Sequence, residues 1–576
     1  MDSAMPTQPP GTGTPFHPNR AAGGAVKLAI ARFAGSLALA STVTLSLIGG
    51  MVLVLSLATV FILNSEDPRG GLVLALGITV LFNLLMFFLS PWLMDLSQKF
   101  LYRTHWTDLE RIRQRSPETA TVIEQICTQK GLKQPRLGLI DDQNPTAFTY
   151  GSLPNTARIV VSEGLFTYLS DDEIAAVYAH ELGHIIHWDF AIMTLGATMI
   201  QICYLFFVFS NRLGDKAKEA MRIPSLAAYI FYFIGTYLLL YLSRIREYYA
   251  DHFSSEVTGN PNALSRALVK IAYGIVEEAK RSDTPSQLLA GTRALGISDS
   301  KTAVIAGTAY RVSTSMDRIG KVFLWDMFNP WAGWMELNST HPLTGKRIRA
   351  LSNYAEQLDL TLEFDMASVM RQGQKLSKPR LYSGFLLDVL LYSAEVIGVV
   401  LGVLVGFGVS SQTQNFSAMV ACPLIGAGIG MLIKAMVLFP NPSLARTTEI
   451  LDLFSDPYAS PLRGLPAELS GTLIGRGQAG FVFGSDLQFQ DATGLLFLRY
   501  ASRFGSIGNA LFGMKRVHAL IGSQATVKGW FRRGVASSLD LLRISSPDGS
   551  IVNSHPRFWT VIFGGLLIIL GMFFLR

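Results

Sequence analysis

Residues 180–184 read His-Glu-Leu-Gly-His, and residues 247–251 further along the chain read Glu-Tyr-Tyr-Ala-Asp. Residues four apart on a helix share one face, so the imidazoles of His180 and His184 can reach the same metal ion. Glu247 can add a third ligand from a second helix. Two histidines, one glutamate and an open position for water form a catalytic zinc site, so we expect one Zn²⁺ per chain.

Glu181 follows His180 directly and therefore points about 100° away around the helix axis. It is expected to act as a general base on a water held at the metal, not as a ligand. Asp251 lies one turn beyond Glu247 and is expected to accept a hydrogen bond from a ligand imidazole, which would fix its tautomer. The competing interpretations are two histidines that occur on one helix by chance, and an ordinary surface acid at position 251.

A helix around residues 180–184 is supported by its own sequence. Ser170-Asp-Asp-Glu173 forms a capping box, and acids in a first turn suit the helix dipole. Three alanines, Ala175, Ala176 and Ala179, favour continuation of the helix.

The composition is that of a membrane protein. Of 576 residues, 49% are hydrophobic and only 16% are charged. The three cysteines have no ligand spacing and predict no disulfide framework. The net charge of +7 is better explained by basic residues beside membrane spans than by nucleic-acid binding, so we expect a lipid bilayer and no nucleic acid as partner.

Long apolar stretches divide the chain and are expected to span the membrane several times. Basic residues precede the first stretch and follow the second, which places the N-terminus and the region after residue 95 in the cytoplasm. The loop at 211–224 should then lie outside, although it is net basic. The expected membrane segments are two helices in 26–94 (Phe33–Asn64 and Gly71–Met94), helices 190–210 and 225–243, two helices in 384–439 (385–409 and 418–438), and one in 557–576.

The remaining regions are expected to be soluble or disordered. Residues 1–25 are rich in Pro and Gly and are expected to be disordered. Residues 95–383 are expected to form a metalloprotease domain, with strands at Arg136–Ile140 and Ala157–Ser162 and an amphipathic helix at Asn262–Arg281. Short alternating runs in 440–556 predict a small β-rich domain. The expected class is a mainly α, multi-span membrane protein with two soluble domains.

Several motifs together resemble the HtpX-type integral-membrane zinc metalloproteases, the family that includes the CAAX prenyl proteases. The metal-binding pentapeptide is followed by Asp189, and the stretch Ser243-Arg-Ile-Arg-Glu247 leads into the third-ligand motif. Thr340-His341-Pro342 with Arg347-Ile348 resembles a downstream element of that family. Ala147, Phe148 and Gly151 resemble its substrate strand, although Thr146 stands where asparagine is expected. The resemblance covers about residues 95–355.

The resemblance implies a zincin-like α-helical protease domain with a small sheet, which hydrolyses membrane or membrane-proximal, misfolded polypeptides. It implies that Asp189 supports a ligand. His341 would donate a hydrogen bond to the oxyanion, and Arg347 would support the substrate or that oxyanion. The expected location is a bacterial plasma membrane, with the active site facing the cytoplasm.

Three alternatives remain open at this point: a prenyl-protein protease, a non-proteolytic zinc-binding scaffold, and a transporter. Intact Glu181 argues against the scaffold, because a structural zinc site needs no base beside its ligands. A transporter would need polar residues over several spans, and only Asp388, Glu395 and Lys434 offer them. The sequence leaves the physiological substrate and the oligomeric state undetermined.

Overall fold

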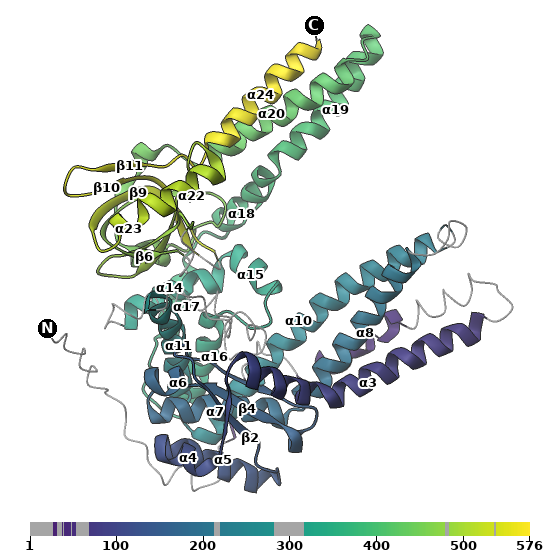
Figure 1. Cartoon of the computed structure of the whole chain (residues 1–576), viewed down its shortest axis with the longest axis vertical. Helices are drawn as coiled ribbons and strands as arrows, with labels where there is room; N and C mark the ends of the chain where they lie inside the picture. The colour runs from purple at the N-terminus through teal and green to yellow at the C-terminus, as the bar shows by residue number, and fades with distance from the viewer. Residues whose placement is uncertain are drawn as a thin grey trace.

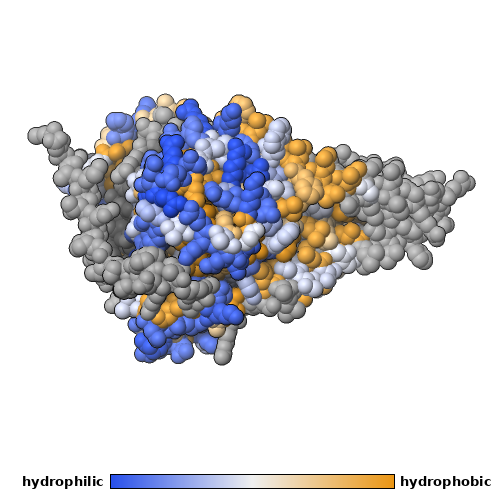
Figure 2. All heavy atoms as spheres, turned by 90° about the horizontal axis from the view of Figure 1, so that it is seen from below, coloured by the Kyte–Doolittle hydropathy of each residue, from blue (hydrophilic) through white to orange (hydrophobic). Residues whose placement is uncertain are grey.

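The chain forms two soluble lobes and two groups of long helices that project from them towards the same side (Figure 1). Seen from below, hydrophilic side chains gather over the lobe that faces the viewer and hydrophobic ones over the neighbouring base of the projecting helices (Figure 2). This computed structural model describes residues 27–30, 37, 40–47, 49–52, 68–211, 219, 221–281, 316–477, 483–534 and 537–575. The expected disordered segment 1–25, much of the expected span at Phe33–Asn64 and most of the loop 211–224 lie outside these residues.

The first lobe contains a four-stranded sheet in the order β1-β2-β4-β3. Strands β2 and β4 are parallel, with Gly138 opposite Val160, whereas β1 and β3 pair antiparallel to their neighbours. Strand β3 is therefore an edge strand. The strands are β1 (His105–Thr107), β2 (Arg136–Ile140), β3 (Ala147–Tyr150) and β4 (Arg158–Ser162), so the two strands expected from the sequence are present.

Helices pack around this sheet and enclose a core of buried aliphatic side chains such as Ile123, Ile159 and Val177. The central helix α7 (Asp171–Ile186) begins at the expected capping box, where the Ser170 backbone N–H donates to the Glu173 carboxylate at 3.0 Å. The other helices of the lobe are α4 (Leu109–Arg115), α5 (Pro117–Lys130), α6 (Glu163–Tyr168), α11 (Pro261–Arg281), α14 (Met316–Phe328), α15 (Pro330–Leu337), α16 (Thr344–Gln357) and α17 (Met366–Gln374), with a 3₁₀ turn at Pro154–Thr156.

The first group of projecting helices contains α3 (Pro68–Leu101), α8 (Asp189–Ser210) and α10 (Arg222–Thr258). Helix α10 has 37 residues, which corresponds to about 55 Å at 1.5 Å per residue. The expected span 225–243 and the third-ligand motif therefore belong to one uninterrupted helix, so the membrane segment itself positions Glu247.

The second group contains α18 (Lys378–Tyr392), α19 (Ala394–Thr413), α20 (Ala418–Leu438) and α24 (Phe558–Leu575). The expected single span at 385–409 was wrong at its start, because the helix breaks at Ser393 and the apolar span begins at Ala394. Lys434 of α20 stabilises the chain at this break, because it donates to the Tyr392 carbonyl at 2.7 Å and to Glu395 at 2.6 Å.

Among the described residues, five helices are long and apolar enough to cross a membrane. They are α8, α10, α19, α20 and α24, with the α20 span extending to Leu444. The protein is therefore a multi-span, mostly helical membrane protein.

The C-terminal lobe is a closed barrel. Strands β6, β7, β8, β10 and β9 form a ring, since β9 pairs with both β10 and β6. Strands β8 and β10 are parallel, and two helices lie between β8 and β9 in the chain. This connectivity is that of the five-stranded Greek-key barrel called the OB-fold.

The barrel strands are β6 (Leu465–Arg476), β7 (Leu487–Gln490), β8 (Leu495–Arg499), β9 (Gln524–Arg532) and β10 (Ser538–Ser545). The outer strands are β5 (Arg446–Thr447) and β11 (Ile551–Asn553), and the helices are α21 (Ile450–Ser455), α22 (Gly505–Lys515) and α23 (Val517–Leu520), with a 3₁₀ turn at Pro442–Leu444.

Candidate metal centre

Helix α7 presents His180 and His184 from one face. Their Nε2 atoms lie 3.2 Å apart, and the two rings are perpendicular. His180 is fully buried and His184 is partly exposed. The one-turn spacing read from the sequence therefore brings both imidazole nitrogens to the same point.

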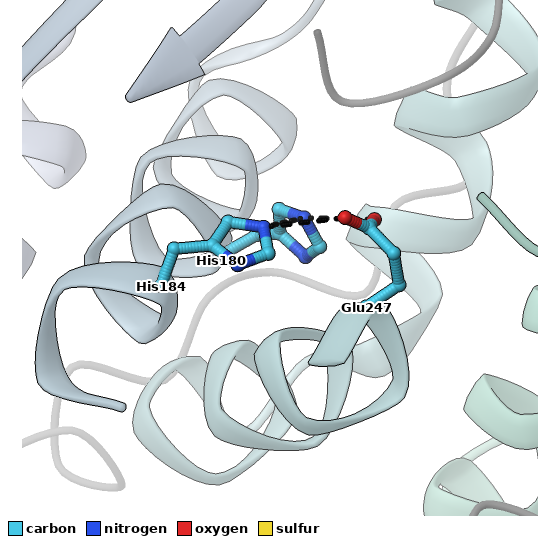
Figure 3. Close-up of side chains that lie close together, drawn as sticks. All are labelled: His180, His184 and Glu247. Carbon is cyan, nitrogen blue, oxygen red and sulfur yellow. Dashed lines mark hydrogen bonds and ion pairs between the residues drawn. The ribbon is translucent and has the colours of Figure 1, made fainter. Parts of the chain in front are cut away.

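Helix α10 brings Glu247 to these nitrogens (Figure 3). Its carboxylate oxygens lie 3.5 Å from His180 Nε2 and 3.5 Å from His184 Nε2. A glycine at position 183 permits this approach, because a Cβ there would lie 3.0 Å from the backbone Cα of Ala250 on α10. The two helices can pack closely enough to share one site.

The three side chains converge closely enough to share one metal ion, since one ligand atom from each lies within 4.8 Å of the others. A tetrahedral centre with Zn–ligand bonds of about 2.0–2.1 Å has ligand–ligand edges of about 3.3–3.4 Å. The two Nε2 atoms lie 3.2 Å apart, and each lies 3.5 Å from a different Glu247 oxygen, Oε2 for His180 and Oε1 for His184. In addition, Glu247 Oε2 is buried and has no hydrogen-bond partner among the described residues. The donor set, two imidazoles and one carboxylate, fits a zinc ion.

Each histidine has a carboxylate behind its ring. His180 Nδ1 lies 2.9 Å from Asp251, and His184 Nδ1 lies 2.5 Å from Asp189. Burial alone would lower the pKa of His180, but the Asp251 and Glu247 carboxylates outweigh it and raise the pKa to about 9. Such partners leave the Nε2 atoms free to bind metal and make them better donors.

Glu181 is 1% exposed and faces the sheet. The Thr149 hydroxyl of β3 donates to one of its oxygens at 2.6 Å, while the other oxygen has no hydrogen-bond partner among the described residues. Burial raises the pKa of Glu181 above its ordinary value. A carboxylate with a raised pKa and one free oxygen is suited to accept and release a proton.

The downstream motif also reaches the site. His341 Nε2 lies 3.4 Å from Glu247, while His341 Nδ1 lies 2.9 Å from the Thr340 hydroxyl. Arg347 is buried and donates to both Asp251 oxygens at 2.9 and 2.6 Å. Its Nη1 also lies 3.3 Å from Glu247. Arg347 therefore contacts Glu247, one of the three residues of the cluster, and Asp251, which contacts His180.

The residues expected to form the substrate strand lie on and after β3. Ala147 and Phe148 are fully buried within the strand, and Gly151 follows its end. A Cβ at Gly151 would lie 3.0 Å from the backbone of Ala157, so the turn there requires a small residue. Strand β3 also carries Thr149 to Glu181, which places this sheet edge beside the site.

Two contributors to the site escaped the sequence analysis. Thr149 was not singled out, although it alternates with Phe148 on a strand and must face the opposite way. Arg246 forms an ion pair with Asp189 and donates to the His187 carbonyl at 3.3 Å. Its position next to Glu247 was a possible signal, but only the packing of α8 against α10 shows its partner.

Comparison with known proteins relates the chain to one family of peptidases. Residues 113–355 match the family described as Peptidase family M48. A "Protease HtpX homolog" of Methanothermobacter thermautotrophicus is 32% identical over 34% of this chain and 71% of the relative. Proteins of the same description from Ralstonia nicotianae (33%, covering 35% and 70%) and Aeropyrum pernix (29%, covering 54% and 97%) are also similar. No solved structure gives a significant match.

Proposed function

Because the chain belongs to peptidase family M48, among the HtpX-type metalloproteases, we propose that it is a membrane zinc endopeptidase with one ion held by His180, His184 and Glu247. The observation that carries this proposal is the convergence of two imidazoles and one carboxylate, whose ligand atoms lie within 4.8 Å of one another. Zinc supports hydrolysis by polarising the substrate carbonyl and by lowering the pKa of water.

Glu181 is the general base in this proposal. Its free, buried oxygen accepts a proton from the attacking water and passes it to the leaving amine. The Thr149 hydroxyl holds the second oxygen and so orients the carboxylate. Asp251 and Asp189 act as positioning residues, because each contacts the Nδ1 side of a ligand imidazole.

His341 is proposed to donate a hydrogen bond to the carbonyl oxygen as negative charge develops on it. Its Nε2 lies 3.4 Å from Glu247 Oε1, and the Thr340 hydroxyl contacts the opposite ring nitrogen. A preorganised donor at this place stabilises the transition state more than the bound substrate. Arg347 positions Asp251 and Glu247 in this proposal, a narrower role than the substrate support expected from the resemblance.

The substrate is proposed to bind as an extended strand along β3. An edge strand offers free backbone N–H and C=O groups, so an added strand gains main-chain hydrogen bonds while its side chains fill neighbouring pockets. Because β3 also carries Thr149, a peptide on this edge would pass close to Glu181.

The proposed substrates are membrane or membrane-proximal polypeptides, including misfolded ones, cut on the cytoplasmic face. Support comes from α10, which carries Glu247 on the same helix as a membrane span. A CAAX-type prenyl protease is the second candidate within the same chemistry. A zinc-binding scaffold is disfavoured, because Glu181 is buried beside the ligands with a free oxygen.

Metal analysis and cleavage of casein by the detergent-purified chain test the proposal. We expect one zinc per chain. Glu181→Gln should retain zinc, because all three proposed ligands remain. Its activity should fall by more than the about 10²–10⁴-fold that is typical when acid–base catalysis alone is lost. Glu247→Ala should lose both zinc and activity.

The matched control is His252→Ala, which removes a histidine of α10 that lies outside the ligand cluster. This variant should keep its zinc and its activity. Full zinc content and full activity in Glu247→Ala would refute the ligand assignment, and near-normal cleavage by Glu181→Gln would show that another group is the base.

A further inference from the structure

Helix α22 of the C-terminal barrel and its N-cap residue, Phe504, carry large apolar side chains on the outside. Four of them recur at spacings of three and four residues and are between 49% and 79% exposed. Such spacing places them on one face of a helix. We call this face the α22 stripe; its members are Phe504, Ile507, Leu511 and Met514.

The opposite face of α22 packs on the barrel through small residues. A Cβ at Gly508 would collide with the Ser502 side chain, and one at Gly513 would lie 2.7 Å from the Gly484 carbonyl oxygen. Phe512 is the one large residue that turns inward, and it stacks on Tyr500 with ring centroids 3.8 Å apart. An ordinary surface helix buries its bulky apolar side chains and exposes its polar ones. Helix α22 instead packs its small residues inward and exposes most of its bulky apolar side chains.

The stripe lies next to a membrane span. The His555 N–H donates to the Ala501 carbonyl at 2.7 Å, and α24 begins three residues later at Phe558. At the start of α22, the Cβ position of Gly505 lies 3.6 Å from the Trp559 indole nitrogen. A tryptophan at the first turn of a span is typical of the membrane–water interface. The stripe is therefore close to the level at which α24 enters the bilayer (Figure 1).

Charge at the ends of α22 is complementary to a phospholipid surface. Arg503 precedes the helix, and Lys515 and Arg516 end it; all three are exposed. Cationic side chains beside an apolar face favour a helix that lies in the headgroup region of an anionic leaflet.

We propose that α22 is an interfacial helix, which inserts the α22 stripe into the same leaflet that α24 enters and so holds the barrel against the bilayer. The occupant of the stripe is lipid, and the cations at both ends contact headgroup phosphates. This role is independent of the peptidase chemistry, so the proposed function can fail without affecting it.

Lipid-borne quenchers test the proposal in the full-length protein. Cys127, Cys203 and Cys422 are first replaced by serine or alanine, and a single cysteine is placed at Ile507 and labelled with bimane. The protein is reconstituted in nanodiscs of phosphatidylethanolamine and phosphatidylglycerol, with or without doxyl-labelled lipid. We expect doxyl lipid to quench the label at 507 and aqueous iodide to leave it bright.

The matched control is Asp548→Cys in the exposed turn between β10 and β11, which Figure 1 shows on the side of the barrel away from α24. This label should respond to iodide and not to doxyl lipid. A second variant, Leu511→Ser with Met514→Ser, should reduce doxyl quenching at 507 without lowering the unfolding temperature, because both side chains are exposed.

Three outcomes would overturn the proposal. Quenching at 507 by iodide alone would mean that the stripe faces water and is open to a soluble polypeptide. Protection from both quenchers in nanodiscs that hold a single copy would mean that the chain covers its own stripe. Protection that appears only when two copies share a nanodisc would assign the stripe to a second copy.

Discussion

At the scale of single residues, the site contains buried charged side chains that contact one another in series. Arg347 lies between Asp251 and Glu247, and Asp251 in turn faces His180. Removing one partner from such a network leaves an uncompensated buried charge, which typically costs about 3–5 kcal/mol. The positions of the proposed ligands therefore depend on Asp251 and Arg347, which are not themselves proposed ligands.

A partly buried acid outside the metal site, Glu118, is expected to make the stability of the protein depend on pH. Glu118 lies in the first turn of α5, and burial, together with the nearby charges of Asp171 and Asp172, raises its pKa to about 7. A carboxyl group with a folded pKa above its unfolded value of 4.5 stabilises the fold fully below pH 4.5. That contribution is lost as the pH rises through 7.

We expect Glu118→Gln to remove this dependence, because glutamine carries no charge at any pH. The variant should unfold at a higher temperature than the parent at pH 8 and at a similar temperature at pH 5, measured in detergent by thermal unfolding. The control is Glu124→Gln on the same helix, which removes an ion pair with Arg113 and should bring no gain at pH 8. Equal unfolding temperatures of Glu118→Gln and parent at pH 8 would contradict the assignment.

At the scale of elements, the helices α19 and α20 touch through glycines. A Cβ at Gly402 would lie 2.3 Å from the Cys422 carbonyl oxygen and 2.6 Å from the Pro423 Cα. Both are backbone atoms, which cannot rotate away. Close backbone approach of this kind is how small residues stabilise helix pairs in membranes.

Gly402→Ala should therefore push the two helices apart and destabilise the C-terminal membrane group by about 1–3 kcal/mol, the usual cost of overpacking. Thermal unfolding in detergent would show this as a lower transition temperature. Gly408→Ala on the same helix is the matched control, because no atom lies within 4 Å of its Cβ position. A transition that falls equally in both variants would mean that alanine acts through α19 alone and not through its contact with α20.

Helix α10 shows how an element can join two environments. Its first part is apolar enough to cross a membrane, and its last turns carry Glu247 and Asp251 into the buried core of the soluble lobe. Helix α10 therefore connects the candidate metal site directly to a membrane span, with no linker between them.

At the scale of the whole molecule, the soluble lobes are fastened to each other by a buried arginine. Arg533 of the barrel donates to the Phe454 and Val322 carbonyls and lies over the Trp325 ring. Residues from both lobes also share one hydrophobic core, which includes Phe323, Phe364 and Phe531. These partners come from segments far apart in the sequence, so no local pattern around Arg533 indicates them.

The basic flanks of the spans lead us to expect that both soluble lobes lie in the cytoplasm, and this orientation can be tested. Cysteines introduced at Lys130, Glu219 and Ala519, after removal of the native ones, can be probed on intact cells with a membrane-impermeant thiol reagent. We expect labelling at 219 alone, because the metalloprotease lobe and the barrel should both lie in the cytoplasm. Permeabilised cells provide the control, in which all three positions should react.

Labelling at 130 or 519 from outside would reverse the orientation and move proteolysis to the other face of the membrane. It would leave the metal site unaffected, because His180, His184 and Glu247 belong to one lobe whichever way the chain is inserted.

The sequence by itself determined the features that depend on local spacing. A repeat of 3.6 residues per turn places His180 beside His184 and Glu247 beside Asp251, whatever surrounds them. The capping box begins α7, and long apolar runs predict membrane helices. These patterns need only neighbours in the chain.

The tertiary structure alone decided which distant segments meet. Contacts between such segments place Thr149 against Glu181 and Arg347 against Asp251. They also close the barrel through β9 and stabilise the helix break at Ser393. The outward stripe of α22 likewise depends on glycines that meet other parts of the barrel. Their common physical reason is that a contact between residues far apart in sequence is selected by the packing of whole elements, which no local repeat encodes.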